Sequence, residues 1–484
     1  MGSNRARQPI AQTSSRLEAP ATEPHINNFY VFTRENAWKY WLEPMVYLSV
    51  SLTAGALSLI LFFNEPAFAQ QPGKEQVIVI RCGRLIDART ANLHEAMLII
   101  IRGERIESIG KVGELMIPPG ATTIDLSGAT VLPGLIDVHA HIIPEIGYTQ
   151  DSFLKRSSAL NAIDGLVNAQ KDLNAGFTTL RDPGDMDPYY SHFAVRDAIN
   201  AGKVQGPRIV AAGHLLSITG GHADFNSGAP ELNIPAFGEI VDGVDEVRKA
   251  VRKEVKWGAD WIKISATGGI YTAGDDPGLP QFTFDEMKAA VDEARRFGRY
   301  VAAHSHGLEG TKAAIRAGVR SVEHGSVLDD EAVELFKANG AYLVPTIYTS
   351  EYTLAEGEKN KQPVHAMEKA RALHEMKRVS FSRAVKGGVK IAYGTDPGII
   401  PQGTNACQFA VMVKWGMSSS QAILSATSIA AEMLGLLKDV GTIEAGKYAD
   451  LIAVTGDPLT NISLLEDVKF VMKGGKVIKN NIGK

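Results

Sequence analysis

The pattern of hydrophobic and polar positions divides the chain into a central region, where strand and helix patterns alternate, and two flanking regions of strand patterns. Between about residues 134 and 437, short apolar runs alternate with helical patterns at 158–176, 245–258 and 283–298. This alternation is typical of repeated βα units, which build a parallel sheet. Each of these three helical patterns ends in Gly, as expected at a helix C-terminus.

The central region contains eight candidate strands, each a short apolar run closed by a polar or small residue. Eight repeated units predict an α/β fold with a closed (β/α)8 TIM-like barrel over residues 134–437. The candidate strands lie at 134–139, 177–182, 207–213, 260–266, 300–305, 319–324, 341–346 and 390–396.

The two flanking regions have similar compositions, although they lie at opposite ends of the chain. Alternating runs separated by Gly and Asn turns follow Pro72-Gly73, and comparable runs return in GTIEAGKYADLIAVTGD and DVKFVMKGGKVIKN. Such runs are typical of antiparallel strands. We therefore expect 74–133 and 438–484 to form the two parts of a small β-sandwich domain built from both chain ends.

The N-terminal part of the chain resembles a targeting segment preceded by an extension. Residues 1–44 are polar and lack periodicity, so we expect a disordered extension. Residues 45–63 form an uncharged apolar run, and Ala67-Phe68-Ala69 has the small-x-small form of a signal-peptidase site. A signal peptide over 45–69 predicts export to the periplasm or the extracellular space after cleavage near Ala69. The alternatives are an uncleaved membrane tether through 45–63 and a buried helix.

Composition and charge exclude several classes of protein. The 484 residues are 45% hydrophobic and 21% charged, as in ordinary globular proteins. A formal net charge of −4 gives no basic footprint for a nucleic acid, so we expect no nucleic-acid partner. The two cysteines, Cys82 and Cys407, cannot build a Cys-rich zinc site or a disulfide framework, and whether they pair is left open. Any metal must therefore be held by His, Asp, Glu or a modified side chain.

Polar residues close several of the apolar strands, at the barrel end where catalytic groups are found. The first candidate strand ends in Asp137-Val138-His139-Ala140-His141, and the two-residue period of a strand places both imidazoles on one face. His-x-His alone is too short a pattern to establish a metal site. Three further strands end in His304, His324 and Asp396, and together these residues predict a metal site.

A lysine inside the fourth candidate strand needs an explanation. In DWIKISA the alternation places Trp261, Lys263 and Ser265 on one face, so Lys263 points into the barrel, where an unpaired ammonium is costly. An ion pair with a nearby acid is one interpretation. The histidines at the ends of the other candidate strands favour a second interpretation, in which Lys263 serves the metal site.

The chain resembles the amidohydrolase superfamily over roughly residues 76–480. The resemblance rests on VLPGLIDVHAHI, IKISATGG, AHSHG, SVEHG and GTDPG, in this order, with a closing GTIEAGKYADLIAV. It implies a site for two divalent metal ions, which we expect to be zinc. His139 and His141 would bind the more buried ion, and His304 and His324 the second. Lys263, N-carboxylated by CO2, would bridge both, and Asp396 would bind the first ion and act as the base.

The resemblance also implies the reaction. A site of this kind cleaves a C–N amide bond with a metal-activated hydroxide, and Asp396 moves the proton to the leaving nitrogen. The loops SITGGHAD, SATGGIYT and AHSHG are most similar to the branch that holds imidazolonepropionase-like proteins, metal-dependent Xaa-Pro and Xaa-Arg dipeptidases and fungal ochratoxinase. We therefore expect a dipeptidase-like enzyme acting on a small peptide or N-acyl amino acid, in a homo-oligomer. A cyclic amide hydrolase is the alternative. A non-catalytic scaffold would have lost ligand positions, whereas all six are present.

Four further residues are candidates without a settled role. His222 and Tyr271 each follow a Gly-Gly turn and could hydrogen-bond the oxyanion or a substrate carboxylate, or could simply pack in their loops. Arg181, at the end of the second candidate strand, could recognise a carboxylate or form a salt bridge with Asp182. We assign Arg181 no role. His306 is a candidate supporting partner of His304.

Overall fold

A computed structural model describes residues 76–147, 150–184, 187–224, 226, 228–229, 231–232 and 234–483. The expected disordered extension (1–44) and the expected signal peptide or anchor (45–69) lie outside the described residues. Within the described part of the chain, no helix is long and apolar enough to cross a membrane.

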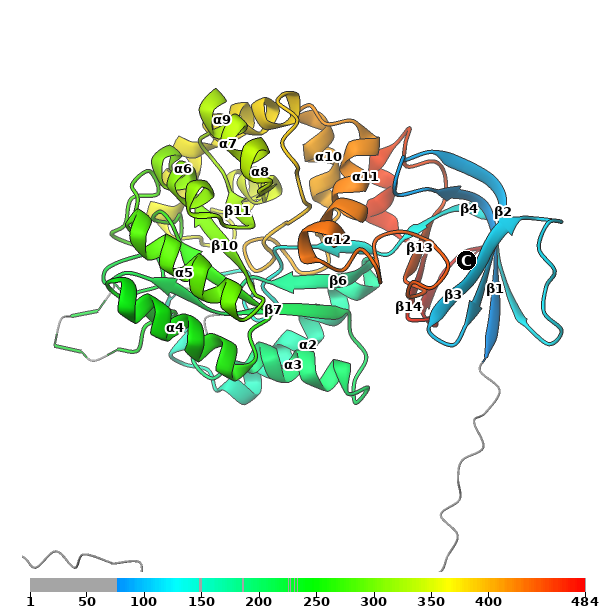
Figure 1. The fold of residues 1–484 in the computed structure, drawn as a ribbon, viewed down its shortest axis with the longest axis horizontal. Coiled ribbons are helices and arrows are strands. Elements are labelled where there is room, and N and C mark those ends of the chain that lie inside the picture. The colour runs from blue at the N-terminus through cyan, green and yellow to red at the C-terminus, as the bar shows by residue number, and fades with distance from the viewer. Residues whose placement is uncertain are drawn as a thin grey trace, which may run out of the picture. The chain divides into compact units, whose positions relative to one another are not determined.

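A curled parallel sheet forms the centre of the α/β fold, and helices cover its outer side (Figure 1). Its strands follow the order β12-β11-β10-β9-β7-β6-β5, with the short β8 paired to β7. Seven of the eight candidate strands are present as strands of this half-barrel. The bounds are β5 Leu135–Asp137, β6 Phe177–Asp182, β7 Arg208–Ser217, β8 Glu239–Ile240, β9 Trp261–Ser265, β10 Tyr300–Ser305, β11 Ser321–His324 and β12 Tyr342–Val344.

The helices alternate with these strands as the sequence pattern predicts. Helix α5 begins with a capping box between Thr283 and Glu286, and α4 and α6 end at Gly258 and Gly318, whose positive φ angles only glycine adopts readily. The bounds are α1 Gln150–Phe153, α2 Ser158–Asn174, α3 Ser191–Asn200, α4 Val244–Trp257, α5 Phe284–Arg296, α6 Leu308–Ala317, α7 Asp330–Asn339, α8 Ile347–Glu356, α9 Val364–Lys386, α10 Cys407–Lys414, α11 Ser419–Ser425 and α12 Ser428–Leu434.

The eighth candidate strand, 390–396, lies between β12 and the end of β5 without forming a regular ladder. On one side, Leu343 N donates to Lys390 O at 2.9 Å. On the other side, Val138 N donates to Tyr393 O at 2.8 Å, and Asp396 N donates to the carbonyl oxygen of His139 at 2.7 Å. Backbone hydrogen bonds therefore connect both edges of the half-barrel through this segment.

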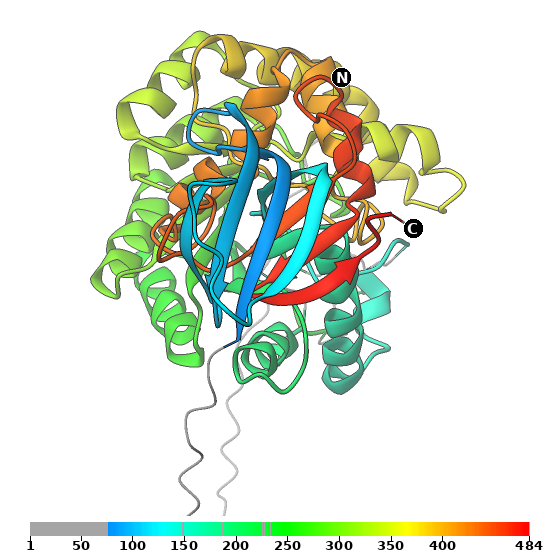
Figure 2. The same ribbon diagram turned by 90° about the vertical axis from the view of Figure 1, so that its right-hand side faces the viewer.

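Both chain ends contribute to one seven-stranded sheet with the order β15-β14-β13-β4-β1-β2-β3 (Figure 2). The C-terminal strand β13 pairs with β4, and β1 pairs with β4 in parallel, so the two ends extend a single ladder. The expected β-sandwich domain is not confirmed, because the strands of both flanking regions belong to this one sheet. The bounds are β1 Val77–Ile86, β2 Leu93–Arg102, β3 Arg105–Lys111, β4 Thr122–Pro133, β13 Leu451–Val454, β14 Phe470–Lys473 and β15 Lys476–Asn480, with a 3-10 turn at Ile462–Asp467.

Alternate residues of this sheet explain why it stays attached to the half-barrel. Ile86, Leu132 and Ile452 belong to the same buried cluster as Phe177 of β6. Their sequence neighbours, among them Val131, point to the opposite face and form a separate cluster. Cys82 and Cys407 are both free thiols, so they do not pair.

Candidate metal centre

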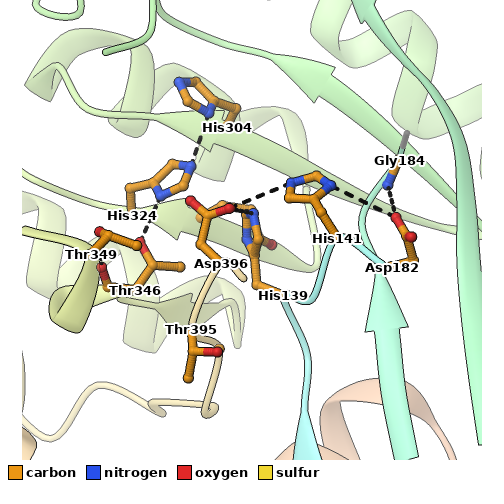
Figure 3. A network of polar contacts seen from close by, with 12 residues as sticks. His139, His141, Asp182, Gly184, His304, His324, Thr346, Thr349, Thr395 and Asp396 are labelled. Carbon is orange, nitrogen blue, oxygen red and sulfur yellow. Dashed lines mark hydrogen bonds and ion pairs between the residues drawn. The ribbon is translucent and has the colours of Figure 1, made fainter. Parts of the chain in front are cut away.

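The six predicted ligands line one cavity of about 370 Å³ at the C-terminal ends of the barrel strands. His139 and His141 follow the end of β5, and Asp396 lies in the segment before Pro397. Lys263, His304 and His324 lie in β9, β10 and β11, so the six residues come from five separate segments of the chain. In Figure 3 the side chains of His139, His141, Asp396, His324 and His304 point toward one another. The structure therefore brings together every residue that the sequence assigned to the metals.

His139, His141 and Asp396 form the first of two groups with metal-ligand geometry. Their potential ligand atoms all lie within 4.8 Å of one another. Asp396 Oδ1 lies 3.7 Å from His139 Nε2 and 3.6 Å from His141 Nε2, so both rings present the same nitrogen to one carboxylate oxygen. This arrangement suits one divalent ion.

His304, His306 and His324 form the second group, again with ligand atoms within 4.8 Å. His324 Nε2 lies 2.9 Å from His304 Nδ1, and His304 Nε2 is a buried atom with no hydrogen-bond partner among the described residues. Burial lowers the pKa of all three imidazoles well below the usual value, which keeps them in the neutral form that binds metals. His306, taken from the sequence as a supporting residue, is thus a geometric member of the group.

Lys263 faces the same cavity from β9. Its side chain is buried, and burial lowers its pKa to about 8 against the opposing effect of Glu323. A lysine with a lowered pKa is a better nucleophile than an ordinary one, because more of it is unprotonated at neutral pH. The environment therefore fits a lysine that reacts with CO2.

Glu323 holds the first histidine in place, and the sequence analysis did not identify it. Its carboxylate lies 2.8 Å from His139 Nδ1 and accepts hydrogen bonds from Arg181 Nη2 (2.7 Å) and Ser321 Oγ (2.5 Å). Burial alone would raise the pKa of Glu323, but Arg181, Lys263 and His139 outweigh it and hold the pKa below its usual range. An ionised Glu323 keeps the proton on His139 Nδ1 and leaves Nε2 free to bind a metal.

Arg181 has neither of the roles left open by the sequence. It is fully buried, its Nε donates to Val138 O at 2.5 Å, and its ion pair is with Glu323. Its position inside the barrel orients the candidate ligand His139 through Glu323. The signal for this pair was present, because both charged residues interrupt apolar strands.

Two buried aspartates hold the loops that carry the first group. Asp137 accepts hydrogen bonds from the backbone N–H of His139 and Thr395 and from the Asn405 amide, which ties β5 to the segment before Asp396. Asp182 accepts from the backbone N–H of Ile142 and Gly184, and its Oδ1 lies 3.8 Å from His141 Nδ1. These contacts fix the backbone on both sides of the His-x-His motif.

Backbone strain also marks this site. His324 (φ 71°), Thr346 (φ 41°) and Asp396 (φ 64°) adopt the left-handed conformation that non-glycine residues rarely occupy. The hydroxyl of Thr346 lies 2.8 Å from His324 Nδ1, so two of the three strained residues are in contact. Such strain costs of order 1–3 kcal/mol each and is concentrated at functional sites.

His222 and Tyr271 both reach the cavity wall. The His222 ring stacks on His304 with centroids 4.2 Å apart, and Thr272 Oγ1 lies 2.8 Å from its Nδ1. The Tyr271 hydroxyl lies 3.1 Å from Thr353 Oγ1. Both side chains are therefore positioned by neighbours and close to the candidate ligands.

The donor set fits divalent transition-metal ions. It consists of imidazole nitrogens and a carboxylate, which suit zinc and related ions, and the buried Lys263 lies in the same cavity. Buried polar atoms normally have a hydrogen-bond partner, and His304 Nε2 has none among the described residues. This nitrogen is therefore available as a metal ligand.

Comparisons with known proteins agree with this geometry. A model of the amidohydrolase family matches residues 130–478. Ochratoxinase from Aspergillus niger is 33% identical over 440 residues, covering 86% of this chain and 89% of that protein. A solved Xaa-Pro dipeptidase with bound methionine in its active site is 40% identical, with a TM-score of 0.78, covering 84% of this chain and 100% of that one. Imidazolonepropionase from Cutibacterium acnes is 26% identical over 374 residues, covering 74% of this chain and 83% of that protein.

Proposed function

The chain belongs to the amidohydrolase family and is a hydrolase that acts on carbon–nitrogen bonds, and from this premise we propose that it cleaves a dipeptide or an N-acyl amino acid with two divalent metal ions. One observation carries the proposal: six side chains suited to metal binding converge on a single cavity at the strand ends. We take the half-barrel and segment 390–396 as a (β/α)8 barrel, in which catalytic groups lie at that end.

The two geometric groups suggest how the ions would be held. His139, His141 and Asp396 would hold one zinc ion, and His304 and His324 the other. Lys263, as an N-carboxylated side chain, would supply the anionic ligand shared by both. When bound, such a pair polarises an amide carbonyl and lowers the pKa of water to near neutrality.

The remaining chemistry belongs to the side chains of the protein. Asp396 takes a proton from the attacking water at a carboxylate oxygen and returns it to the leaving nitrogen. Glu323 keeps His139 in the tautomer that leaves Nε2 available. His222 and Tyr271 donate hydrogen bonds to the oxyanion or to the substrate.

Relatives support a substrate with an amino-acid leaving group. The similar Xaa-Pro dipeptidase, solved with methionine bound in its active site, supports a linear dipeptide over a cyclic amide. The imidazolonepropionase relative keeps a cyclic amide as the alternative substrate. A non-catalytic scaffold gains no support, because every predicted ligand reaches the cavity.

A hydrolysis panel tests the proposal directly. Zinc-loaded protein is incubated with Xaa-Pro and Xaa-Arg dipeptides, N-acyl amino acids and cyclic imides, and the released amine or acid is measured. We expect turnover of the linear substrates and its loss in Asp396→Asn. Turnover of the cyclic compounds alone would support the alternative, and no turnover of any amide would contradict the proposed function.

We further propose that the protein is exported, with cleavage near Ala69, and that it assembles as a homo-oligomer. The apolar run at 45–63 and the small residues after it support export.

A further inference from the structure

A second lysine, Lys377, lies on the wall of the same cavity and has no part in the proposed metal site. It belongs to α9, where it falls on the buried stripe with Leu373, Phe381 and Ala384. These spacings of four and three residues define one face of a helix. The sequence therefore places a charged side chain at a position where the helix is otherwise apolar or small.

Among the described residues, the ammonium of Lys377 is hydrogen-bonded only to Thr346. Its Nζ donates to the carbonyl oxygen of Thr346 at 2.9 Å and approaches the Thr346 hydroxyl at 3.5 Å. Among the described residues, no carboxylate lies within 4.0 Å of it, whereas Lys369 on the same helix is paired with Asp275 at 2.8 Å. An ammonium can donate three hydrogen bonds, so part of its capacity is unused.

Burying an unpaired charge destabilises a protein unless the charge serves another purpose. The Lys377 side chain is only 3% exposed, and burial lowers its pKa to about 8. A group with this pKa remains mostly protonated at neutral pH. Lys377 is therefore a buried cation in direct contact with no carboxylate of the described residues, although the charge of Asp396 in the same cavity raises its pKa.

The surrounding wall indicates the kind of ligand that would neutralise this cation. Much of the lining is apolar, with Phe153, Leu215, Phe237, Ile270 and Ile399 among its members. The described lining residues include no arginine and only two lysines, Lys263 and Lys377. If Lys263 becomes an anionic carbamate, Lys377 is the remaining lysine cation of a cavity whose lining combines apolar side chains with seven histidines and Asp396.

We propose that Lys377 binds the free carboxylate of the amino-acid part of the substrate. The inference rests on the proposed function for the nature of that substrate, and it deepens it by assigning the selectivity for acids. The enzyme would then prefer N-acyl amino acids with an apolar side chain over the corresponding neutral amides. The ammonium donates to a carboxylate oxygen, while Thr346 O keeps it aimed into the cavity.

A different role for Lys377 would act through Thr346. The Thr346 hydroxyl contacts both Lys377 and His324 Nδ1. In this alternative, Lys377 orients His324 through Thr346 and does not contact the substrate. Such a role would affect acids and amides equally, whereas carboxylate binding affects acids alone. The comparison of the two ligands therefore separates the roles.

The test measures binding by calorimetry, so that it does not depend on turnover. N-acetyl-L-phenylalanine and N-acetyl-L-phenylalaninamide are titrated in excess zinc into Asp396→Asn protein, alone and combined with Lys377→Met, Lys377→Gln, Thr346→Ala or Lys386→Met. The zinc content of every variant is measured, because Asp396 is itself a candidate ligand. Lys386 lies on the same helix but is exposed, so it controls for the loss of a lysine charge. Lys377→Gln provides a second, polar replacement if Lys377→Met folds poorly.

We expect the Asp396→Asn parent to bind the acid about 10- to 100-fold more tightly than the amide, as one charged hydrogen bond allows. Both Lys377 variants should lose this preference, and the Thr346 and Lys386 variants should keep it. A parent protein without the preference, or a Lys377 variant that retains it, would overturn the inference. Failure of the proposed function is distinguished by the wild-type hydrolysis panel, since preferential binding of the acid without hydrolysis of any amide would leave the inference standing.

Discussion

Glu323→Gln removes the charge from the buried contact that orients His139. In the native protein one carboxylate oxygen lies 2.8 Å from His139 Nδ1 and 2.7 Å from Arg181 Nη2, and all three side chains are buried. Glutamine has nearly the same shape. It leaves the Arg181 guanidinium without a counter-ion and removes the charge that fixes the His139 tautomer.

Two effects of different size should follow. Removing one partner of a buried ion pair costs about 3–5 kcal/mol of folding free energy, because the remaining charge stays desolvated. Loss of a residue that orients a metal-binding histidine lowers metal affinity about 10- to 100-fold. Replacing Arg181 by Met in the same protein removes the unpaired charge, so the double variant should regain part of the stability but not the metal affinity.

Urea unfolding and a chelator competition assay measure these two effects separately. Glu331→Gln is the matched control, because Glu331 also has two cationic partners, Lys312 Nζ at 2.6 Å and Arg316 Nη2 at 2.5 Å, but lies at the surface. Its unfolding midpoint should stay close to that of the wild type, since exposed ion pairs contribute little. A Glu323→Gln protein with wild-type unfolding and wild-type zinc affinity would refute the reasoning.

Three further expectations concern the ligands and the N-terminus. Lys263→Ala should lose metal and turnover together, and Lys263→Arg should not restore them, because a guanidinium cannot become an anionic carbamate; an Arg variant that keeps two metals by elemental analysis would contradict the bridge. His139→Ala and His304→Ala should each abolish turnover while the far-ultraviolet circular dichroism stays native, and near-wild-type turnover in either would show that the site is misplaced. The exported protein should begin near Gln70 by N-terminal sequencing, and an intact Met45 would favour the membrane anchor.

The candidate metal ligands could be predicted from the sequence because all except Lys263, which lies inside β9, close or follow an apolar run. A polar residue after an apolar run indicates the C-terminal end of a strand, where catalytic groups of barrels lie. The two-residue period of a strand places His139 and His141 on one face. The partners of these ligands were not predictable in the same way. Arg181 and Glu323 are 142 positions apart, and only the arrangement of the folded strands brings them together.

In the fold, too, the sequence predicts single strands better than the pairing between strands. Alternation predicts a strand and its buried face, but not which strand it pairs with. The sequence therefore predicts one β-sandwich domain from both flanking regions, but not that their strands extend a single ladder. Segment 390–396 was expected as a full strand. A side chain at Gly394 would come within 2.3 Å of Val344, so the chain passes too close to its neighbours for an ordinary residue there.

The central claim is that the protein cleaves amides with metal ions held by these residues. The most direct measurement follows hydrolysis of an N-acyl amino acid by one preparation as isolated, after prolonged chelation and after addition of zinc, with metal content determined at each stage. The account predicts about two ions per chain in the active protein, loss of activity with the metal and recovery with its return. Activity that survives complete removal of the metal would contradict it.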